Sequence, residues 1–253
     1  MGKFIVTGAA SGIGEAVCSR LEDDGETVIK VDRHNADIVA DLATPEGRGA
    51  ALQACLAASK DGLDGLVCCA GIGSTSPDVT MIPQVNFYGS IELLQGLKDA
   101  LAARGGAAVL VSSNSAPQDT DPNYVVALLS NNQEQLKTSL ATISGHAAYS
   151  GSKQAIAIWM RRNAPDYARS GVRLNAIAPG YTRTAMTEAT EKDPKYSAAI
   201  KDYLETIPLG RAGKVSEIAN VIGFLLCSEA SFVSGSLLYV DGGHDAMYRP
   251  DSI

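Results

Sequence analysis

Short apolar runs alternate with helix-length segments along the chain, and this alternation limits the folds that the sequence can adopt. The runs that resemble strands are residues 4–6, 27–31, 38–40, 66–69, 107–111, 172–178 and 237–240. Continuous apolar strands are typical of a parallel sheet that is buried on both faces, with helices as the connections. Because such crossovers are right-handed, we expect an α/β fold with a doubly wound parallel sheet of about seven strands and helices on both faces.

No linker rich in Pro, Gly or Ser divides the 253 residues, and no internal repeat is visible. We therefore expect a single domain over residues 1–253. Two stretches fit the alternation poorly. Residues 114–148 combine turn-forming residues with a helix-like patch over 124–140, and residues 185–206 read as helical. Long excursions from an α/β core often form lids or partner surfaces, so we expect an insertion at 114–148 and a substrate lid at 185–206.

The composition excludes several classes of protein. Hydrophobic residues make up 45% of the chain and charged residues 19%, which is ordinary for a globular protein. The net charge of −7 argues against nucleic acid or an anionic membrane as the main partner. No apolar run reaches the roughly 18 residues of a membrane span, and the N-terminus lacks the pattern of a signal peptide. We expect a cytoplasmic protein.

The cysteines and histidines indicate neither disulfides nor a metal site. The number of cysteines is odd, and they lie in strand-like or helix-like segments. We therefore expect five reduced thiols, at Cys18, Cys55, Cys68, Cys69 and Cys227. His34, His146 and His244 are scattered without the spacing of metal ligands.

A glycine-rich turn joins the first apolar strand to the helix that follows. It reads Thr-Gly-Ala-Ala-Ser-Gly-Ile-Gly over residues 7–14. Glycines let the backbone turn tightly and approach a pyrophosphate, and a helix N-terminus offers free N–H groups and a positive dipole end. A tight strand-to-helix connection is the alternative interpretation, but the place of the turn at the end of the first strand favours dinucleotide binding, so we expect a Rossmann-type sheet. The predicted contacts in the turn are Gly8, Ser11, Gly12, Ile13 and Gly14.

Asp32 closes the second strand. Its carboxylate can accept hydrogen bonds from the adenosine ribose and would repel a 2′-phosphate, so it favours NAD over NADP. Arg33 could pair with such a phosphate, but the glycine turn contains no Lys or Arg. Asp41 and Leu42 follow the third strand and are candidates for contact with adenine. A cap for the next helix is a nearly equal interpretation of Asp41.

Tyr149 and Lys153 are four residues apart, which places them on one face of a helix. A phenol with its ordinary pKa of about 10 is a poor base at neutral pH, and a nearby ammonium favours the phenolate. The pair therefore suits proton transfer. The spacing alone is common by chance, and it gains weight because it follows a fifth strand that ends in Ser112 and Ser113.

Together these motifs resemble the classical short-chain dehydrogenases/reductases over nearly the whole chain. Further matches are Asn86, the Asn-Ala-Ile-Ala-Pro-Gly segment at 175–180 followed by Thr184, and Asp-Gly-Gly at 241–243. The resemblance implies an NAD(H)-dependent oxidoreductase that moves hydride between the nicotinamide and a secondary carbinol carbon. It also implies a homodimer or a homotetramer.

The resemblance implies a role for each matching residue. Tyr149 would be the general acid/base, and Lys153 would lower its pKa and hold the nicotinamide ribose. Ser113, preferred over Ser112, would donate a hydrogen bond to the substrate oxygen. Asn86 would hold a water that relays protons. The remaining implied cofactor contacts are Ala70, Gly71, Pro179, Gly180, Thr182 and Thr184.

The chain departs from the family pattern at two places. Cys68 and Cys69 stand where the family commonly has two asparagines, one of which braces the sheet, so a different support of the cofactor site is expected. The insertion at 114–148 lengthens the connection between Ser113 and Tyr149. We hypothesise that it shapes the mouth of the substrate site, alters the usual dimer contact, or does both.

Segments outside the catalytic motifs are similar to a hydroxysteroid dehydrogenase/carbonyl reductase subgroup of this family, at residues 40–48, 64–71 and 245–250. The expected substrate is a bulky hydrophobic secondary alcohol or its ketone, a 3α-hydroxysteroid being one example. Candidate pocket residues are Ala116, Tyr181, Met186 and Tyr203. One alternative is a reductase for another carbonyl compound, such as an aryl ketone or an oxoacyl thioester. Another is a non-catalytic NAD-binding sensor, which the complete catalytic set disfavours.

Overall fold

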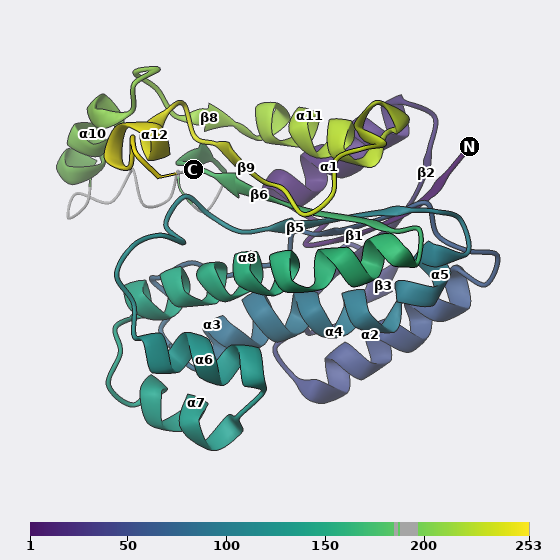
Figure 1. Ribbon diagram of the computed structural model, residues 1–253, viewed down its shortest axis with the longest axis horizontal. Coiled ribbons are helices and arrows are strands. Elements are labelled where there is room, and N and C mark those ends of the chain that lie inside the picture. The colour runs from purple at the N-terminus through teal and green to yellow at the C-terminus, as the bar shows by residue number, and fades with distance from the viewer. Residues whose placement is uncertain (185–186, 188–196, 253) are drawn as a thin grey trace.

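A seven-stranded parallel sheet forms the centre of the computed structural model, which describes residues 1–184, 187 and 197–252. The strand order is β3-β2-β1-β4-β5-β6-β9, so the chain winds outward from β1 in both directions (Figure 1). The strands are β1 (Lys3–Thr7), β2 (Thr27–Asp32), β3 (Ile38–Val39), β4 (Gly65–Cys68), β5 (Ala107–Val111), β6 (Arg173–Pro179) and β9 (Leu237–Val240). The predicted doubly wound sheet is confirmed.

Helices cover both faces of the sheet (Figure 1). One face carries α1 (Gly12–Asp23) and α11 (Val215–Leu226), and the other carries α2 (Pro45–Ala58), α4 (Gly89–Gly96) and α8 (Gly145–Arg169). The smaller helices are α3 (Met81–Pro83), the π-helix η1 (Gln84–Tyr88), α5 (Lys98–Ala102), α6 (Pro122–Ser130), α7 (Gln133–Leu140), α10 (Ser197–Thr206), the 3-10 helix η2 (Ser228–Ala230) and α12 (His244–Tyr248). Among the described residues, no helix has both the length and the apolar character needed to cross a membrane.

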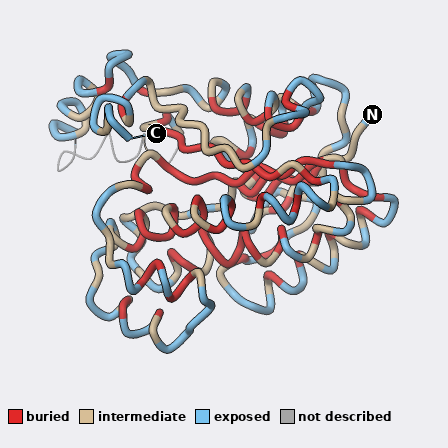
Figure 2. The backbone as a smooth tube through the Cα atoms, viewed as in Figure 1, coloured by how far each residue is buried: buried red, intermediate tan, exposed pale blue. Residues whose placement is uncertain are grey.

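Two apolar layers enclose the sheet because neighbouring residues of a strand point to opposite faces. Val6 and Val109 belong to the layer beneath α1 and α11, whereas Ile5 and Leu110 belong to the layer beneath α2, α4 and α8. Figure 2 shows the buried backbone along the strands and on the inner sides of these helices. Burial of each such side chain contributes about 1.5–3 kcal/mol, so the strands form a stiff platform for the loops at their ends.

The structure refines several boundaries and adds elements that the apolar pattern did not indicate. The helix-like patch at 124–140 is two helices, α6 and α7, because Asn131 has a left-handed φ of 54° between them. A small sheet of β7 (Thr182–Arg183) and β8 (Gly213–Lys214) was not expected, nor was α12. Within the predicted lid, residues 185–186 and 188–196 lie outside the described residues, and 197–206 form α10.

The insertion packs its first helix against α8, the helix that carries Tyr149 and Lys153. Tyr124 of α6 is fully buried, and the hydroxyl of Thr120 donates a hydrogen bond of 2.7 Å to the carbonyl of Ala147. A Cβ added to Gly151 would lie 2.5 Å from Thr120 Oγ1 and 2.7 Å from Cδ1 of Tyr124. The absence of a side chain at Gly151 therefore lets α6 lie close to α8.

Gly151→Ala is expected to lower the free energy of unfolding by about 1–3 kcal/mol, because the new methyl group forces α6 and α8 apart. Gly49→Ala is the matched control, since Gly49 lies within α2 and a Cβ there would meet no atom within 4 Å. The control should raise stability by about 0.5–1 kcal/mol through helix propensity. Urea unfolding of both variants measures the effect, and equal changes would contradict the close packing.

Candidate active site

The candidate site residues gather at the edge of the sheet where the strands end. Gly8 follows β1, Asp32 ends β2, Ala70 follows β4, Ser113 follows β5 and Pro179 ends β6. Since these strands are all parallel, their carboxyl ends meet at one edge. Ligands of open α/β sheets bind at this edge, next to the point where the strand order reverses.

The glycine turn after β1 depends on backbone geometry that side chains would disrupt. Gly8 and Gly12 have φ values of 69° and 59° in the left-handed region. A Cβ on Gly14 would lie 2.0 Å from the carbonyl oxygen of Gly8, so the helix starts very close to the strand. Ser11, the N-cap of α1, makes no side-chain capping hydrogen bond. The first N–H groups of α1 are therefore not capped by that residue, as a site for an anion requires.

Asp32 contacts this turn directly. Its Oδ2 accepts a hydrogen bond of 3.0 Å from the backbone N–H of Ala10, and its Oδ1 accepts one of 2.6 Å from that of Arg33. Two ionised oxygens have about four acceptor positions, so the carboxylate can also accept from ribose hydroxyls. The sequence predicted the contact with ribose but did not indicate that Asp32 also holds the glycine turn against β2.

A threonine and a cysteine make polar contacts at the ends of β1 and β4. The buried Thr7 hydroxyl accepts a hydrogen bond of 3.1 Å from the N–H of Ala70, which joins the ends of β1 and β4. Sγ of Cys68 lies 3.7 Å from the carbonyl oxygen of Ser90 on α4. Burial raises the pKa of the Cys68 thiol to about 12, so this cysteine stays protonated at neutral pH and serves packing. All five cysteines are free thiols.

Ser113 and Tyr149 form the centre of the site. Burial raises the pKa of Tyr149 above its ordinary value, and a hydrogen bond from Ser113 partly offsets this rise. Oγ of Ser113 also accepts hydrogen bonds from the backbone N–H of Ser115, at 3.1 Å, and from its hydroxyl, at 3.0 Å. Nζ of Lys153 lies 5.8 Å from the centre of the Tyr149 ring. That Lys153 lowers the pKa of Tyr149 stays a prediction.

Lys153 is buried and tied to β5. Its Nζ donates a hydrogen bond of 2.8 Å to the carbonyl of Val111, and the hydroxyl of Ser112 donates one of 2.8 Å to the carbonyl of Lys153. Ser112 therefore points at the backbone of α8, while Ser113 points at Tyr149. Burial lowers the pKa of Lys153 to about 8, because the ammonium loses hydration.

Asn86 lies in the π-helix η1 and is fully buried. Its Oδ1 accepts from the N–H of Ile72 at 2.8 Å, and its Nδ2 donates to the carbonyl of Ile72 at 3.1 Å and to Oγ of Ser152 at 3.3 Å. A Cβ on Gly71 would lie 3.3 Å from Asn86 Oδ1 and 3.6 Å from Lys153 Nζ. The side chain braces the loop after β4 against α8, and its proposed relay water stays a prediction.

The remaining cofactor candidates lie in two loops. Thr44 Oγ1 accepts from the N–H of Gly47 and caps α2, so the alternative that Asp41 caps this helix is wrong. Asp41 is exposed, whereas the side chain of Leu42 is buried. The second loop follows β6 and contains Thr184. A Cβ added to Gly12 would lie 3.4 Å from Cγ2 of this threonine.

The short distance between Gly12 and Thr184 places the loop after β6 against the glycine turn. In the same loop, the hydroxyl of Thr182 donates a hydrogen bond of 3.0 Å to the carbonyl of Gly180. Thr182 is buried. The structure thus brings Gly180, Thr182 and Thr184 to the same edge of the sheet as the glycine turn.

A cavity of about 310 Å³ opens at Asn114, the residue after Ser113. Its lining comes from the loop after β5 and from the C-terminal segment, and consists of Asn114, Pro117, Gln118, His244, Asp245, Tyr248 and Arg249. Of the predicted pocket residues, Ala116 is buried, the rings of Tyr181 and Tyr203 lie 5.9 Å apart, and Met186 is outside the described residues. The sequence did not predict His244 as a site residue. The Gly242-Gly243 pair directly before it predicts a tight turn there and could have drawn attention to it.

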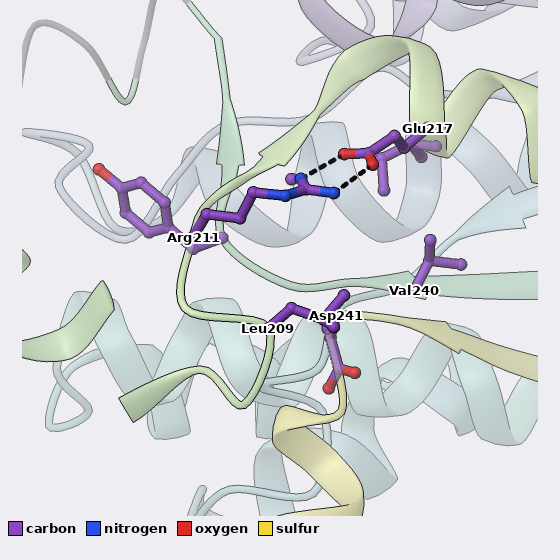
Figure 3. A pocket seen from close by; sticks show the side chains of 9 residues that line it. Leu209, Arg211, Glu217, Val240 and Asp241 are labelled. Atoms are coloured by element: carbon purple, nitrogen blue, oxygen red, sulfur yellow. Dashed lines mark hydrogen bonds and ion pairs between the residues drawn. The ribbon is translucent and has the colours of Figure 1, made fainter. Parts of the chain in front are cut away.

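A smaller cavity of about 100 Å³ lies between β9 and the start of α11 (Figure 3). In it, Arg211 donates hydrogen bonds to both carboxylate oxygens of Glu217, at 2.8 Å and 2.7 Å. Hydrogen bonding to this guanidinium lowers the pKa of Glu217 to about 2. These charges are paired with each other, so we assign the pair to the fold rather than to ligand binding.

Comparison with known proteins defines the class. Residues 3–126 match the family model described as short chain dehydrogenase, and residues 135–245 match the one described as Enoyl-(Acyl carrier protein) reductase. The chain belongs to the short-chain dehydrogenase/reductase family of oxidoreductases.

Among individual relatives, the 3-alpha-hydroxysteroid dehydrogenase/carbonyl reductase of Comamonas testosteroni is 37% identical over 99% of both chains. The crystal structure of a 3-alpha-hydroxysteroid dehydrogenase from Pseudomonas sp. B-0831, complexed with NADH, is 41% identical and superposes with a TM-score of 0.92. That match covers 99% of this chain and 100% of that chain. Galactitol 2-dehydrogenase of Cereibacter sphaeroides is 32% identical over 94% of this chain and 93% of that protein.

The lowered pKa of Lys153 predicts how stability depends on pH. Between pH 8 and 10.5 the unfolded chain holds the Lys153 proton and the folded chain releases it. The free energy of unfolding therefore rises with pH in this range, by up to about 3 kcal/mol from this group. Lys153→Met removes this titrating group and its contribution. Urea unfolding should show that the free energy of unfolding of the wild type minus that of the variant rises between pH 8 and 10.5. A constant difference would contradict the buried ammonium.

Proposed function

We propose that this protein is an NAD(H)-dependent oxidoreductase that interconverts a bulky hydrophobic secondary alcohol and its ketone, a 3α-hydroxysteroid being one candidate. The observation that carries the proposal is the hydrogen bond between Ser113, which follows β5, and Tyr149 of α8. Lys153 of the same helix bonds to Val111 at the end of β5, and this is the sheet edge that holds the glycine turn. The hydroxysteroid dehydrogenases among its relatives support the substrate class.

The residues at the sheet edge fit NAD. The turn at Gly8, Gly12 and Gly14 brings backbone close to the first turn of α1, where N–H groups would bind the pyrophosphate. The carboxylate of Asp32 would bind the adenosine ribose and would repel a 2′-phosphate. Thr184, which lies against the glycine turn, would bind the carboxamide of the nicotinamide. When bound, NAD supplies the hydride acceptor or donor.

The protein would supply the proton chemistry. Tyr149 Oη would take the proton of the alcohol during oxidation and return it to the carbonyl oxygen during reduction. Ser113, already hydrogen-bonded to Tyr149, would donate to the same substrate oxygen and stabilise its developing charge. The ammonium of Lys153 would favour the phenolate and would bind the nicotinamide ribose, while Val111 holds it in place.

Turnover tests the proposal. The purified protein is mixed with NAD or NADP and a panel of 3α-hydroxysteroids, aryl carbinols and small secondary alcohols, and NADH formation is followed by absorbance. We expect oxidation of the bulky alcohols with NAD. Turnover of aryl or small alcohols alone would refute the bulky substrate and retain the mechanism, whereas NADH binding without any turnover would favour a sensor.

Tyr149→Phe should lower kcat by roughly a hundredfold or more, because the proton then lacks an acceptor. NADH affinity, measured by fluorescence titration, should change less than about twofold. Tyr167→Phe is the matched control on the same helix, where the hydroxyl only donates to the carbonyl of Leu94, and it should retain turnover. Full turnover by Tyr149→Phe would refute the mechanism.

Asp32→Asn should weaken NADH binding about tenfold and strengthen NADPH binding, because the amide neither accepts as strongly nor repels a phosphate. Asp99→Asn, on the exposed side of α5, changes the net charge equally and should leave both affinities unchanged. Fluorescence titration measures both affinities. Unchanged discrimination in Asp32→Asn would contradict the cofactor assignment.

A further inference from the structure

His244 lies at the start of α12 and is buried, with 3% of its surface exposed. Gly242 and Gly243 precede it with φ values of 70° and 88°, and this left-handed pair turns the chain back toward the active site. Asp241 stabilises the turn, since its Oδ1 accepts from the N–H of Gly243 at 3.1 Å and its Oδ2 from that of Asp245 at 2.7 Å. The imidazole is therefore held in one place.

The imidazole joins two other segments of the chain. Nδ1 lies 3.3 Å from Nδ2 of Asn114 and 3.2 Å from the hydroxyl of Tyr203, and Nε2 lies 3.2 Å from Oγ1 of Thr206. Its ring also packs edge-on against Tyr203, with 5.1 Å between ring centres, and at a tilt against Tyr248, with 4.7 Å between ring centres. Tyr203 and Thr206 belong to α10, whereas Asn114 directly follows the catalytic Ser113.

These contacts define one tautomer. The hydroxyl of Thr206 donates its proton to the carbonyl of Tyr203 at 2.7 Å, so it can only accept from His244. The proton therefore lies on Nε2, and Nδ1 accepts from the amide of Asn114 or the hydroxyl of Tyr203.

These contacts hold a helix that is otherwise largely exposed, and Asn114 also hydrogen-bonds directly to Tyr203 of this helix. The ten residues of α10 are all described, and none of them is buried. Asn114, in contrast, is anchored, because its backbone N–H donates to the carbonyl of Pro179 at 3.0 Å. His244 thus connects a weakly packed helix to the rigid end of the sheet, and it does so at the wall of the 310 Å³ cavity.

We propose that His244 is a positioning residue that fastens α10 to the loop of Ser113 and thereby shapes the substrate cavity for a bulky alcohol. The inference rests on the proposed function where it concerns substrate. A small alcohol needs only the hydrogen bonds of Ser113 and Tyr149. A bulky alcohol would also extend past Asn114 along the cavity wall that His244 and Tyr248 form, and loss of the histidine contacts with α10 would displace that wall.

The test compares His244→Phe, which retains a ring between Tyr203 and Tyr248 but removes both nitrogens, with His244→Asn. The asparagine Oδ1 occupies the place of Nδ1 and can accept from Asn114 or Tyr203. Met247→Leu, at a half-exposed position of the same short helix, is the matched control. Hydrogen exchange of the α10 amides, NADH affinity, and KM and kcat for a bulky and a small secondary alcohol are measured for all three.

For His244→Phe we expect α10 exchange and the KM for the bulky alcohol each to rise about tenfold, which corresponds to the loss of two neutral hydrogen bonds. The KM for the small alcohol, kcat and NADH affinity should change less than about twofold. His244→Asn should recover most of the bulky-alcohol KM, and Met247→Leu should resemble the wild type.

Two results would overturn the inference. Unchanged exchange of α10 in His244→Phe would show that the histidine does not fasten the helix. A parallel loss with bulky and small alcohols would show a general structural role without positioning of substrate. If the wild type oxidises no alcohol of the panel, the proposed function fails, and the exchange measurement alone decides whether His244 holds α10.

Discussion

The hydrogen bond from Lys153 to the carbonyl of Val111 fixes the distance between the two elements that carry the candidate catalytic residues. One end belongs to α8, which carries Tyr149, and the other to β5, which leads into Ser113. A second bond, from the hydroxyl of Ser112 to the carbonyl of Lys153, sets the rotation of the helix. Because the ammonium is buried, a shift of α8 would leave a charge without its acceptor, which is costly in a low dielectric. The burial that lowers the pKa of Lys153 thus also favours the one position of α8 in which Nζ reaches the carbonyl of Val111.

The remaining polar contacts of the sheet edge follow a similar logic. Where strands end, backbone groups lose their ladder partners and must find others. The side chain of Thr7 accepts a hydrogen bond from the N–H of Ala70, and that of Asp32 accepts one from the N–H of Ala10. The side chain of Asn86 bonds to both the N–H and the carbonyl of Ile72. Of these three residues, Asp32 is also a predicted contact of the cofactor, so one carboxylate would hold the glycine turn and bind the ribose. Such fixed polar groups favour electrostatic stabilisation, because they need little reorganisation.

The 310 Å³ cavity is built differently from the edge that carries the glycine turn. That edge lies directly on the strands, whereas the cavity is lined by the loop after β5 and by the C-terminal segment around α12. On the outer side of α8, α6 of the insertion lies against Gly151. These segments are held by side-chain contacts between distant parts of the chain. Loops of this kind can change binding preference while the sheet stays the same.

The amino-acid sequence by itself determined the parallel sheet, the glycine turn, Asp32 and the pairing of Tyr149 with Lys153, because each depends on local spacing and on the period of a strand or helix. Only the tertiary structure decided that Lys153 is buried against Val111, that Asn86 lies in a π-helix, and that His244 meets Asn114. These outcomes join residues far apart in the chain, so they depend on the register of parallel strands and on helix packing. Spacing along a sequence carries no information about such distances, which is why the substrate side could be predicted only as a class.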